Sequence, residues 1–255
     1  MQLIFKYDFE RLMSYSVNKA NNIKVLEAAP YTLLSFPEVG YFNYAFNHND
    51  EPFTEEQLKN IQAFYLQQDI AKHQLIVDAK HKDNGLLLTN SGYAHKATIA
   101  KTVLLPNSFS HQQIMPGLAF VPVTQNNLAV FTRLYLNGFG AVNRNADSVL
   151  DNFGTLLNKP GISLYVLQHN LDFVGINVLY HHNDESLLAG GAIMPEFRNH
   201  GYHKSGLAFR IQQSLALNNS KKIVAWAYDD SISLQNMLKL KMTVQQKFMV
   251  YEYCN

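Results

Sequence analysis

The feature that most constrains the fold is an apolar strand pattern that stops at a proline and is followed by a helix and a second apolar strand. The first strand pattern covers Ser186–Met194 and ends before Pro195, which cannot donate a hydrogen bond to a sheet ladder. A helical pattern covers about Tyr202–Leu217, with apolar residues at four-residue spacing on one face. The segment Lys222–Tyr228, KIVAWAY, predicts the second strand. Strands that alternate with helices in this way indicate a mixed sheet in an α/β or α+β domain.

Similar patterns flank this segment and extend through the C-terminal half of the chain. Short apolar or alternating runs predict further strands, and apolar residues at helical spacing predict further helices. The expected strands cover residues 120–123, 163–168, 173–180 and 244–253, and the expected helices cover residues 128–135, 146–157 and a short stretch through Met237.

A polar segment with two prolines divides the chain of 255 residues into two halves. This segment, PNSFSHQQIMPG at residues 106–117, interrupts the regular patterning on either side of it. The halves also end alike, because a helix pattern is followed by an alternating strand pattern at residues 84–105 and again at residues 234–253. We therefore predict an N-terminal domain at residues 1–105, a linker at 106–117 and a second domain at 118–255.

Charge and cysteine content exclude several classes of partner and chemistry. The 21 basic and 20 acidic residues leave a net charge of +1, which gives no general attraction to nucleic acid or to an acidic membrane. The N-terminal sequence lacks the pattern of a secretory signal, and no run approaches the ~18 apolar residues that span a bilayer. A single cysteine, Cys254, provides neither a disulfide framework nor a cysteine zinc site. We expect a soluble protein of the cytoplasm.

Two adjacent glycines, Gly190 and Gly191, lie inside the strand pattern that precedes Pro195. A glycine inside a strand marks a β-bulge or a place where another group approaches the backbone closely. For the glycine pair alone, close packing of a helix on the strand is the better explanation. The residues that follow the pair favour a ligand at this end of the strand.

The residues between strand and helix have the composition of an anion-binding loop. Residues 198–204, RNHGYHK, lead into the first turn of the helix, where free N–H groups and the positive end of the helix dipole attract anions. Gly201 admits a ligand close to the backbone, and Arg198 and Lys204 supply charge that suits a phosphate. A basic loop alone is more often a solvated surface. Because strand, glycine pair, proline, loop and helix occur together, a phosphate site is the preferred interpretation.

At these residues the chain resembles the GCN5-related N-acetyltransferase (GNAT) superfamily. Ile193–Lys204, IMPEFRNHGYHK, is similar to that family's acyl-CoA-binding motif, in which an apolar strand end and a proline precede Arg or Gln, two residues, Gly, one residue, and Gly or Ala. Ser233–Met242, SLQNMLKLKM, is similar to a later motif in which a short helix ends at a Leu-Gly-Phe corner. The resemblance covers about residues 120–255.

The resemblance implies an N-acetyltransferase that holds acetyl-CoA between two splayed parallel strands, here those ending near Met194 and Tyr228. The implied fold has two GNAT-like halves, each a mixed, mostly antiparallel sheet flanked by helices. Backbone groups at the end of the first strand would pair with the pantetheine arm of the cosubstrate, and N–H groups of the loop would hold its diphosphate. The cofactor-binding residues implied in this way are Ile193, Met194, Arg198, Asn199, His200, Gly201, Tyr202, His203, Lys204, Ser233 and Asn236.

Within this family the chain looks most like tandem proteins, in which a degenerate N-terminal half precedes a working C-terminal half. Residues 37–46, PEVGYFNYAF, are similar to a segment of that first half. Its corresponding helix is expected to begin among the carboxylates of Asp50, Glu51, Glu55 and Glu56, and it has no Arg-x-x-Gly sequence. Because these carboxylates would repel a diphosphate, we expect the first half to bind no acyl-CoA and to serve as a support or as a wall of the acceptor site.

Five positions depart from the family pattern. Asn199 replaces a usual glycine, and His203 replaces a usual small residue, so we expect the imidazole to turn away from the phosphates. Lys241 and Met242 stand where Gly-Phe is common. Met237 stands where many members carry the tyrosine that protonates the departing thiolate.

The sequence identifies no general base. The attacking amine, with a pKa near ~10.4 for a lysine-like group, must lose a proton, and the developing oxyanion needs a donor, which by resemblance is a backbone N–H near Ile193. With methionine at position 237, we expect the thiolate to leave with help from water or from a hydroxyl at Ser233 or Tyr228, while Asn236 positions the cofactor. The alternative is that Asp230, Ser231 or Ser233 only caps the N-terminus of this helix.

Two functions from different classes therefore stay open. The first is transfer of an acetyl group from acetyl-CoA to a primary amine of a small molecule or protein. The second is a noncatalytic CoA-binding or regulatory module that has kept the fold and lost the chemistry. No nucleic acid or membrane partner is expected from the charge and the apolar runs of the chain. No metal is expected, because the histidines at 181, 182, 200 and 203 have no carboxylate or cysteine to complete a ligand set. The oligomeric state is left open.

Overall fold

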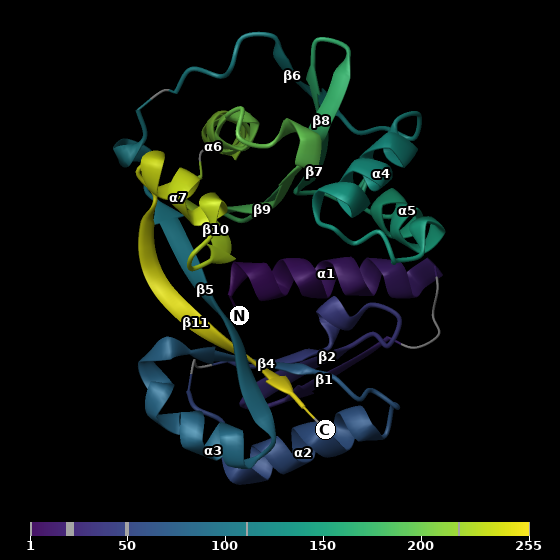
Figure 1. The fold of residues 1–255 in the computed structure, drawn as a ribbon, viewed down its shortest axis with the longest axis vertical. Coiled ribbons are helices and arrows are strands. Elements are labelled where there is room, and N and C mark those ends of the chain that lie inside the picture. The colour runs from purple at the N-terminus through teal and green to yellow at the C-terminus, as the bar shows by residue number, and fades with distance from the viewer. Residues whose placement is uncertain (1, 19–22, 49–50, 111, 219, 255) are drawn as a thin grey trace. The chain divides into compact units, whose positions relative to one another are not determined.

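The computed structural model describes residues 2–18, 23–48, 51–110, 112–218 and 220–254, which form two compact units (Figure 1). Unit 1 contains Ser16–Lys101 and Val244–Asn255, and unit 2 contains Gln2–Tyr15 and Thr102–Thr243. Both units are built on strands covered by helices, which confirms the predicted α/β (α+β) class. Within the described part of the chain, no helix combines the length and apolar character that crossing a membrane would require.

Unit 2 contains the elements that the C-terminal sequence patterns predict, except for the last strand, which lies mostly in unit 1. Its strands follow the order β10-β9-β8-β7-β6, with antiparallel pairing from β6 to β9 and parallel pairing between β9 and β10. Each element expected from residue 120 onward is present, and its ends lie within a few residues of the prediction. The elements are β6 (Leu118–Pro122), α4 (Leu128–Gly138), α5 (Ala146–Gly154), β7 (Ile162–His169), β8 (Asp172–His182), β9 (Glu185–Ile193), α6 (Tyr202–Asn218), β10 (Lys222–Tyr228), α7 (Ile232–Lys239) and β11 (Thr243–Tyr253), most of which belongs to unit 1.

The parallel strands β9 and β10 separate after a short paired stretch. They pair only at Glu185–Leu187 with Lys222–Val224, whereas β9 continues to Ile193 and β10 to Tyr228. The register between β8 and β9 shifts between Val178 and Tyr180, and such a bulge bends a strand away from regular pairing. The predicted splay of the two strands is therefore confirmed.

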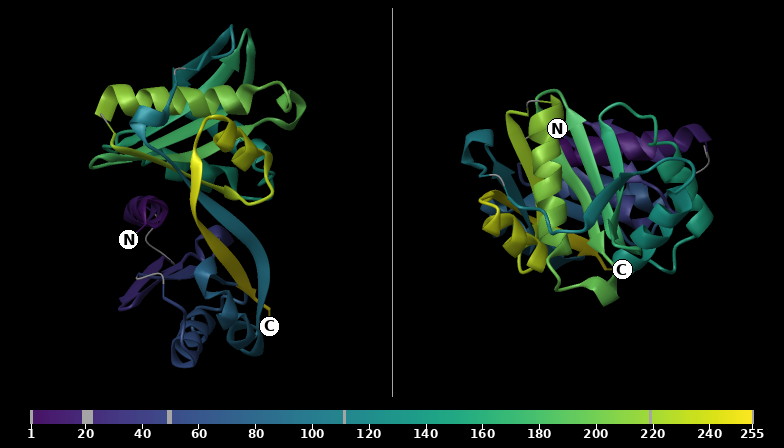
Figure 2. Two further views of the ribbon diagram at one scale, coloured as in Figure 1. Left: turned by 90° about the vertical axis from the view of Figure 1, so that its left-hand side faces the viewer. Right: turned by 90° about the horizontal axis from the view of Figure 1, so that it is seen from above.

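Helices cover both faces of the unit 2 sheet. A Cβ atom built on Gly191 would lie 2.6 Å from Arg210 Nη2 of α6, whereas a Cβ built on Gly138 of α4 would lie 2.8 Å from the Cβ of Ala192. Since neighbouring strand residues point to opposite faces, α6 and α4 cover different faces of β9. Figure 2 shows α6 on one face and α1 (Leu3–Asn18) on the other. Tyr7 of α1 joins the apolar core that α4 and α5 form with the sheet.

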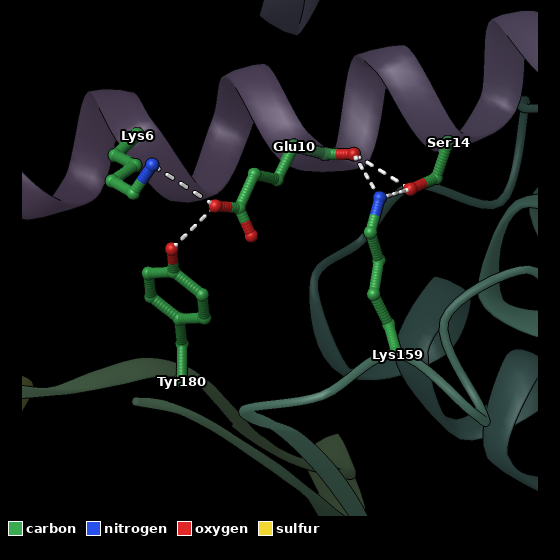
Figure 3. Close-up of polar contacts among 5 residues, drawn as sticks. All are labelled: Lys6, Glu10, Ser14, Lys159 and Tyr180. Carbon is green, nitrogen blue, oxygen red and sulfur yellow. Dashed lines mark hydrogen bonds and ion pairs between the residues drawn. The ribbon is translucent and has the colours of Figure 1, made fainter. Parts of the chain in front are cut away.

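The helix α1 also forms polar contacts with unit 2, although the sequence patterns gave it no role. Glu10 accepts a hydrogen bond from the Tyr180 hydroxyl at 2.8 Å and pairs with the Lys6 ammonium at 3.2 Å. From the segment after α5, Lys159 Nζ donates to the carbonyl of Glu10 at 3.3 Å and contacts Ser14 Oγ (Figure 3). These contacts assign the first helix of the chain to its second unit.

Unit 1 contains a second strand–helix–strand arrangement. Its strands follow the order β1-β2-β3-β4-β11-β5, and β3 pairs parallel with β4 only at Tyr44–Phe46 with Gln74–Ile76. Its core lies between the strands and α2 and α3. The elements are β1 (Lys24–Ala28), β2 (Tyr31–Ser35), β3 (Tyr44–Asn47), α2 (Glu55–Leu66), β4 (Gln74–Asp78), α3 (Gly85–Asn90), β5 (Tyr93–Leu104) and the end of β11.

The N-terminal helix belongs to unit 2, and the C-terminal strand belongs mostly to unit 1. Leu3 and Tyr7 of α1 are buried in the core of unit 2, whereas Phe248–Glu252 of β11 pair with β4 of unit 1. A division in chain order could not anticipate these long-range contacts. The domains at 1–105 and 118–255, with a linker at 106–117, stay a prediction, and the compact units follow a different division at both chain ends.

Candidate functional site

A cavity of about 720 Å³ lies in unit 2 where β9 ends and α6 begins. Its walls come from the end of α4, the last residues of β9, the loop into α6, and one side of α7. The lining residues are Gly138, Phe139, Gly191, Ala192, Ile193, Phe197, Arg198, Asn199, Gly201, Tyr202, His203, Lys204, Ile232, Ser233, Asn236 and Lys239.

Nine of the eleven predicted cofactor-binding residues line this cavity, and Met194 and His200 do not. The N–H of Met194 donates to the carbonyl of Val174 at 3.0 Å, so it is not available to a ligand. The His200 imidazole is exposed and its Nδ1 lies 2.7 Å from the carbonyl of Arg198, which holds the ring against its own loop. The geometry therefore does not support the expected role of Met194 or a side-chain role of His200.

Two positive φ angles shape the loop that leads into α6. Gly201 has φ +84° and Asn199 has φ 67°, so both residues adopt the left-handed conformation. Asparagine tolerates this conformation better than most residues, which explains how it stands where the family pattern has glycine. At Gly201 an added Cβ would lie 3.4 Å from Met115 Cε, so the position has space but needs an unusual backbone.

The first turn of α6 offers free donors to the cavity. The carbonyl of Gly201 accepts the first helical hydrogen bond, from Ser205 N at 3.0 Å. Among the described residues, the N–H groups of Tyr202, His203 and Lys204 have no hydrogen-bond partner, as is usual at a helix start. No lining residue in the described chain is an Asp or Glu, whereas Lys204 and Lys239 both line the cavity. The local charge and the helix dipole therefore both favour an anion.

Arg198 lines the cavity but its guanidinium is used within the protein. Its Nε donates to the carbonyl of Ile193 at 3.2 Å, and its Nη2 donates to the carbonyl of Gly138 at 3.0 Å. The side chain thus fastens the end of β9 to the end of α4. Its charge still contributes to the cavity, but the expected direct contact with a phosphate requires these bonds to break.

Close helix packing explains one glycine of the pair, Gly191. Arg210 of α6 is fully buried and donates from Nη1 to the carbonyls of Gly190 at 2.6 Å and Val178 at 3.2 Å. Burial lowers the pKa of Arg210 to about 9. A Cβ on Gly191 would collide with this guanidinium, and one on Gly206 would lie 2.8 Å from Asn177 Nδ2. For Gly191 and Gly206, helix packing is the correct explanation, whereas a Cβ on Gly190 would lie at an ordinary 3.4 Å from Val178 Cγ2. A buried positive charge lies against the sheet at this point.

His203 lines the cavity, and its ring contacts two residues of α7. Asn236 Nδ2 of α7 lies 3.2 Å from His203 Nδ1, and Ser233 Oγ lies 3.5 Å from Nε2. Burial, with a smaller contribution from the positive charge of Arg210, lowers the pKa of His203 to about 4. The ring is therefore neutral near pH 7. The side chain of Ser231 accepts from Leu234 N at 3.1 Å and caps α7, so Ser233 is not the cap and lines the cavity instead.

The late motif keeps its corner with different residues. Lys241 has φ 67°, the left-handed conformation that the usual glycine supplies, and Met242 is buried where the usual phenylalanine would be. Met237 is also buried, and Thr102 Oγ1 lies 3.5 Å from its sulfur. Position 237 thus belongs to the core of unit 2, and its side chain does not line the cavity.

Several cavity residues gave no signal in the sequence. Gly138 and Phe139 end α4, and Ile232 and Lys239 lie at the two ends of α7. Only the folded arrangement brings them beside the loop, although Lys239 shares a helix face with Asn236 at three-residue spacing, which could have identified it.

The other candidate groups take structural positions. His181 Nδ1 lies 2.7 Å from Ser186 Oγ, which contacts Ser220 Oγ, and all three residues are buried. Trp226 packs against Phe5 of α1, with ring centroids 5.7 Å apart, whereas Tyr228 is 63% exposed. Within the described ranges, no group of three or more His, Cys, Asp or Glu residues is placed to hold a metal ion.

Comparison with known proteins identifies the fold. No protein-family model and no curated protein matches the chain. A functionally unknown conserved protein from Staphylococcus epidermidis has 16% identity and a TM-score of 0.70, over 95% of this chain and 99% of that one. A GCN5-related N-acetyltransferase from Kribbella flavida has 11% identity and a TM-score of 0.66, over 96% of this chain and 95% of that one. A tandem GNAT protein from the clavulanic acid biosynthesis pathway has 11% identity and a TM-score of 0.65, over 95% and 86%.

The chain has the tandem GNAT fold. Coverage of 86% or more of each of these chains means that the likeness includes both units and not the C-terminal motifs alone. At identities of 11–16%, the comparison establishes the fold, and the chemistry has to be argued from the residues of this chain.

Proposed function

We propose that this GNAT-fold chain binds acetyl-CoA in the cavity at the end of β9 and transfers the acetyl group to a primary amine of a small molecule or protein. The observation that carries the proposal is the free N–H groups at the start of α6, which open into a cavity lined by lysines and by no described carboxylate. A diphosphate needs such donors, and a cavity of about 720 Å³ has the size of a small-molecule site.

The walls of the cavity suit the remainder of the cosubstrate. Phe139, Ile193 and Ile232 give an apolar surface next to the polar side chains of Ser233 and Asn236. A pantetheine arm has both amide groups and methylene groups, so it needs hydrogen-bonding partners beside apolar contacts. The N–H of Ile193 lies on the edge of β9 that faces away from β8, because the N–H of Met194 faces β8. It is the proposed donor to the oxyanion that develops during acetyl transfer.

The leaving thiolate needs a proton or a hydrogen bond that Met237 does not provide. Ser233 lines the cavity, and Tyr228 is exposed at the end of β10. We propose that water or one of these hydroxyls assists the thiolate. Since no carboxylate lines the cavity in the described chain, the proton of the acceptor amine leaves through water or through a group outside this lining.

Isothermal titration calorimetry tests the binding site. One acetyl-CoA per chain is expected, because α2 of unit 1 begins with carboxylates, whereas α6 has free N–H groups beside a cavity that no described carboxylate lines. Two sites per chain, or none, would contradict the assignment.

The noncatalytic alternative rests on Met237, which is buried in the core and gives the site no acid. Release of CoA above the hydrolysis background, measured across a panel of primary amines, distinguishes an acetyltransferase from a CoA-binding module. Tight binding with no amine-dependent CoA release would favour the module.

A further inference from the structure

The free N–H groups and the apolar walls give the side chain of His203 no role in the candidate site. Its backbone N–H is one of the three free donors at the start of α6. Its side chain lines the same cavity and reaches two residues of α7. The ring therefore borders the place where an anion on the N–H groups would lie.

The contact with Asn236 fixes which ring nitrogen carries the proton. An amide nitrogen can only donate, so Nδ1 of His203 accepts, and the neutral ring carries its hydrogen on Nε2. Ser233 Oγ, 3.5 Å from Nε2, lies at the limit of hydrogen-bond distance. The Nε2–H group is therefore a donor with only a long contact inside a cavity that is otherwise rich in donors.

The surrounding charges keep this donor suited to an anion. The fully buried Arg210 acts on the ring with its positive charge, and Lys204 and Lys239 line the cavity. No described carboxylate lines the cavity to accept the imidazole hydrogen. An anionic oxygen is the acceptor that these surroundings favour.

We infer that His203 is a binding residue of the site, and that its Nε2–H donates a hydrogen bond to a diphosphate oxygen while Asn236 holds the ring in place. This inference rests on the proposed acetyl-CoA site. It goes beyond that site because the donor is a side chain, at a position where the family pattern has a small residue. The competing idea is that the imidazole obstructs the cavity and lowers the affinity for any diphosphate.

Two substitutions distinguish a donor from an obstruction. His203→Ala removes the donor, and His203→Gln replaces it with an amide N–H of similar reach. In calorimetric titrations with acetyl-CoA, His203→Ala is expected to bind about tenfold more weakly, and His203→Gln within about threefold of the wild type. His95→Ala, which removes an exposed histidine of unit 1, is the control and should bind as the wild type does. Equal or tighter binding by His203→Ala would overturn the inference, and so would equal losses in both His203 variants.

A spectroscopic measurement separates this inference from the proposed function. The ring nitrogen signals of His203 are identified by their absence from the ¹⁵N spectrum of His203→Gln and followed while inorganic pyrophosphate is added to the wild-type chain. A neutral ring with hydrogen on Nε2, and a shift of that nitrogen on titration, are expected. No shift at saturating pyrophosphate, or no detectable pyrophosphate binding, overturns the role of His203. If the wild type binds pyrophosphate through His203 but not acetyl-CoA, the proposed function fails and the anion contact stands.

Discussion

The two units contain the same strand–helix–strand arrangement with different chemistry at the start of the helix. In each unit, two parallel strands pair at only three positions, β3 with β4 and β9 with β10. In unit 1, Thr54 Oγ1 accepts from Gln57 N while the Gln57 side chain accepts from Thr54 N, so a capping box bonds one N–H group of the first turn of α2. In unit 2, Gly201 starts α6 and leaves three N–H groups free beside a cavity.

The charges at the two helix starts also differ, negative at α2 and positive at α6. The first turn of α2 carries Glu55 and Glu56, and Glu55 pairs with Lys59 at 2.6 Å, whereas the first turn of α6 has no acidic residue and includes Lys204. Glu51 also precedes α2, and Asp50, the remaining carboxylate expected there, lies outside the described residues. The comparison teaches that the same backbone arrangement can carry opposite charges at the start of its helix. By the proposed function, the anion binds at the start that has the positive charge and the larger number of free N–H groups.

The largest effect is expected from giving α6 the charge that α2 has. Gly201→Glu places a carboxylate and a side chain beside the free N–H groups, at a residue with φ +84°. Acetyl-CoA binding, measured by calorimetry, is expected to fall by at least about a hundredfold, because repulsion is added to the loss of space. Gly201→Ala imposes the same backbone strain without the charge and should lose far less affinity. Wild-type affinity in a folded Gly201→Glu chain would contradict the loop assignment.

The buried histidine of unit 1, His73, lies among aromatic rings, whereas His203 of unit 2 contacts polar residues of α7. His73 of unit 1 stacks between the rings of Tyr65 and Tyr253, and its Nε2 lies 2.8 Å from Tyr93 Oη. Burial lowers the pKa of His73 to about 4. An unfolded chain takes up this proton near pH 6.5, so the stability that neutral His73 contributes is complete above pH 6.5 and is lost as the pH falls toward 4.

Urea unfolding at pH 7 and pH 5 measures this contribution. Between these values, His73 is expected to account for a loss of about 2 kcal/mol in the free energy of unfolding of unit 1. His73→Gln cannot titrate, so its stability should depend less on pH by that amount. Equal pH dependence in the wild type and the variant would show that folding does not lower the pKa of His73.

A smaller effect is expected for the polar residues of α7 that face the cavity. Asn236→Ala should weaken acetyl-CoA binding by about 1–3 kcal/mol, because it removes a polar partner and releases the His203 ring. Ser233→Ala should lower turnover with an amine acceptor more than it lowers binding, if its hydroxyl assists the thiolate. Calorimetry and steady-state kinetics on both variants check these roles. Unchanged binding and turnover in both, with the fold intact, would reject them.

The smallest effect is expected in unit 1, where the helix start is structural. Thr54→Ala removes the side-chain cap of α2 and should lower the stability of unit 1 by about 1 kcal/mol, as measured by urea unfolding. Acetyl-CoA affinity should stay unchanged. A loss of affinity comparable to that of Asn236→Ala would mean that the capped helix also takes part in binding, which would end the contrast between the units.

Local patterns in the sequence predicted the elements of unit 2 and most of its cavity. Pro195 and the change from strand to helical spacing fixed where β9 ends and α6 begins, and Gly201 marked the turn between them. These features depend on neighbouring residues, so they can be interpreted from the sequence alone. The same holds for the left-handed corner at Lys241 once the late motif is recognised.

Features that depend on distant parts of the chain could not be predicted in this way. The sequence does not reveal that Arg198 would bond to the carbonyls of Ile193 and Gly138, because the end of α4 is 60 residues away along the chain. Nor does it reveal that His203 would meet Asn236, or that α1 would pack on unit 2. In each case a side chain finds a partner that only the tertiary arrangement supplies.

The place of β11 in unit 1 has a consequence for the order in which the chain folds during synthesis. Residues 248–252 lie beside β4, and the sheet order puts β11 between β4 and β5, yet these residues follow the whole of unit 2 along the chain. A ribosome therefore releases β1 to β5 long before the strand that separates β4 from β5 emerges. Until then, β4 and β5 each expose an edge that other strands can pair with. Nascent unit 1 is accordingly the part of this protein with the longest exposure to misassembly, and loss of the last twelve residues would leave it without an interior strand however well unit 2 had folded.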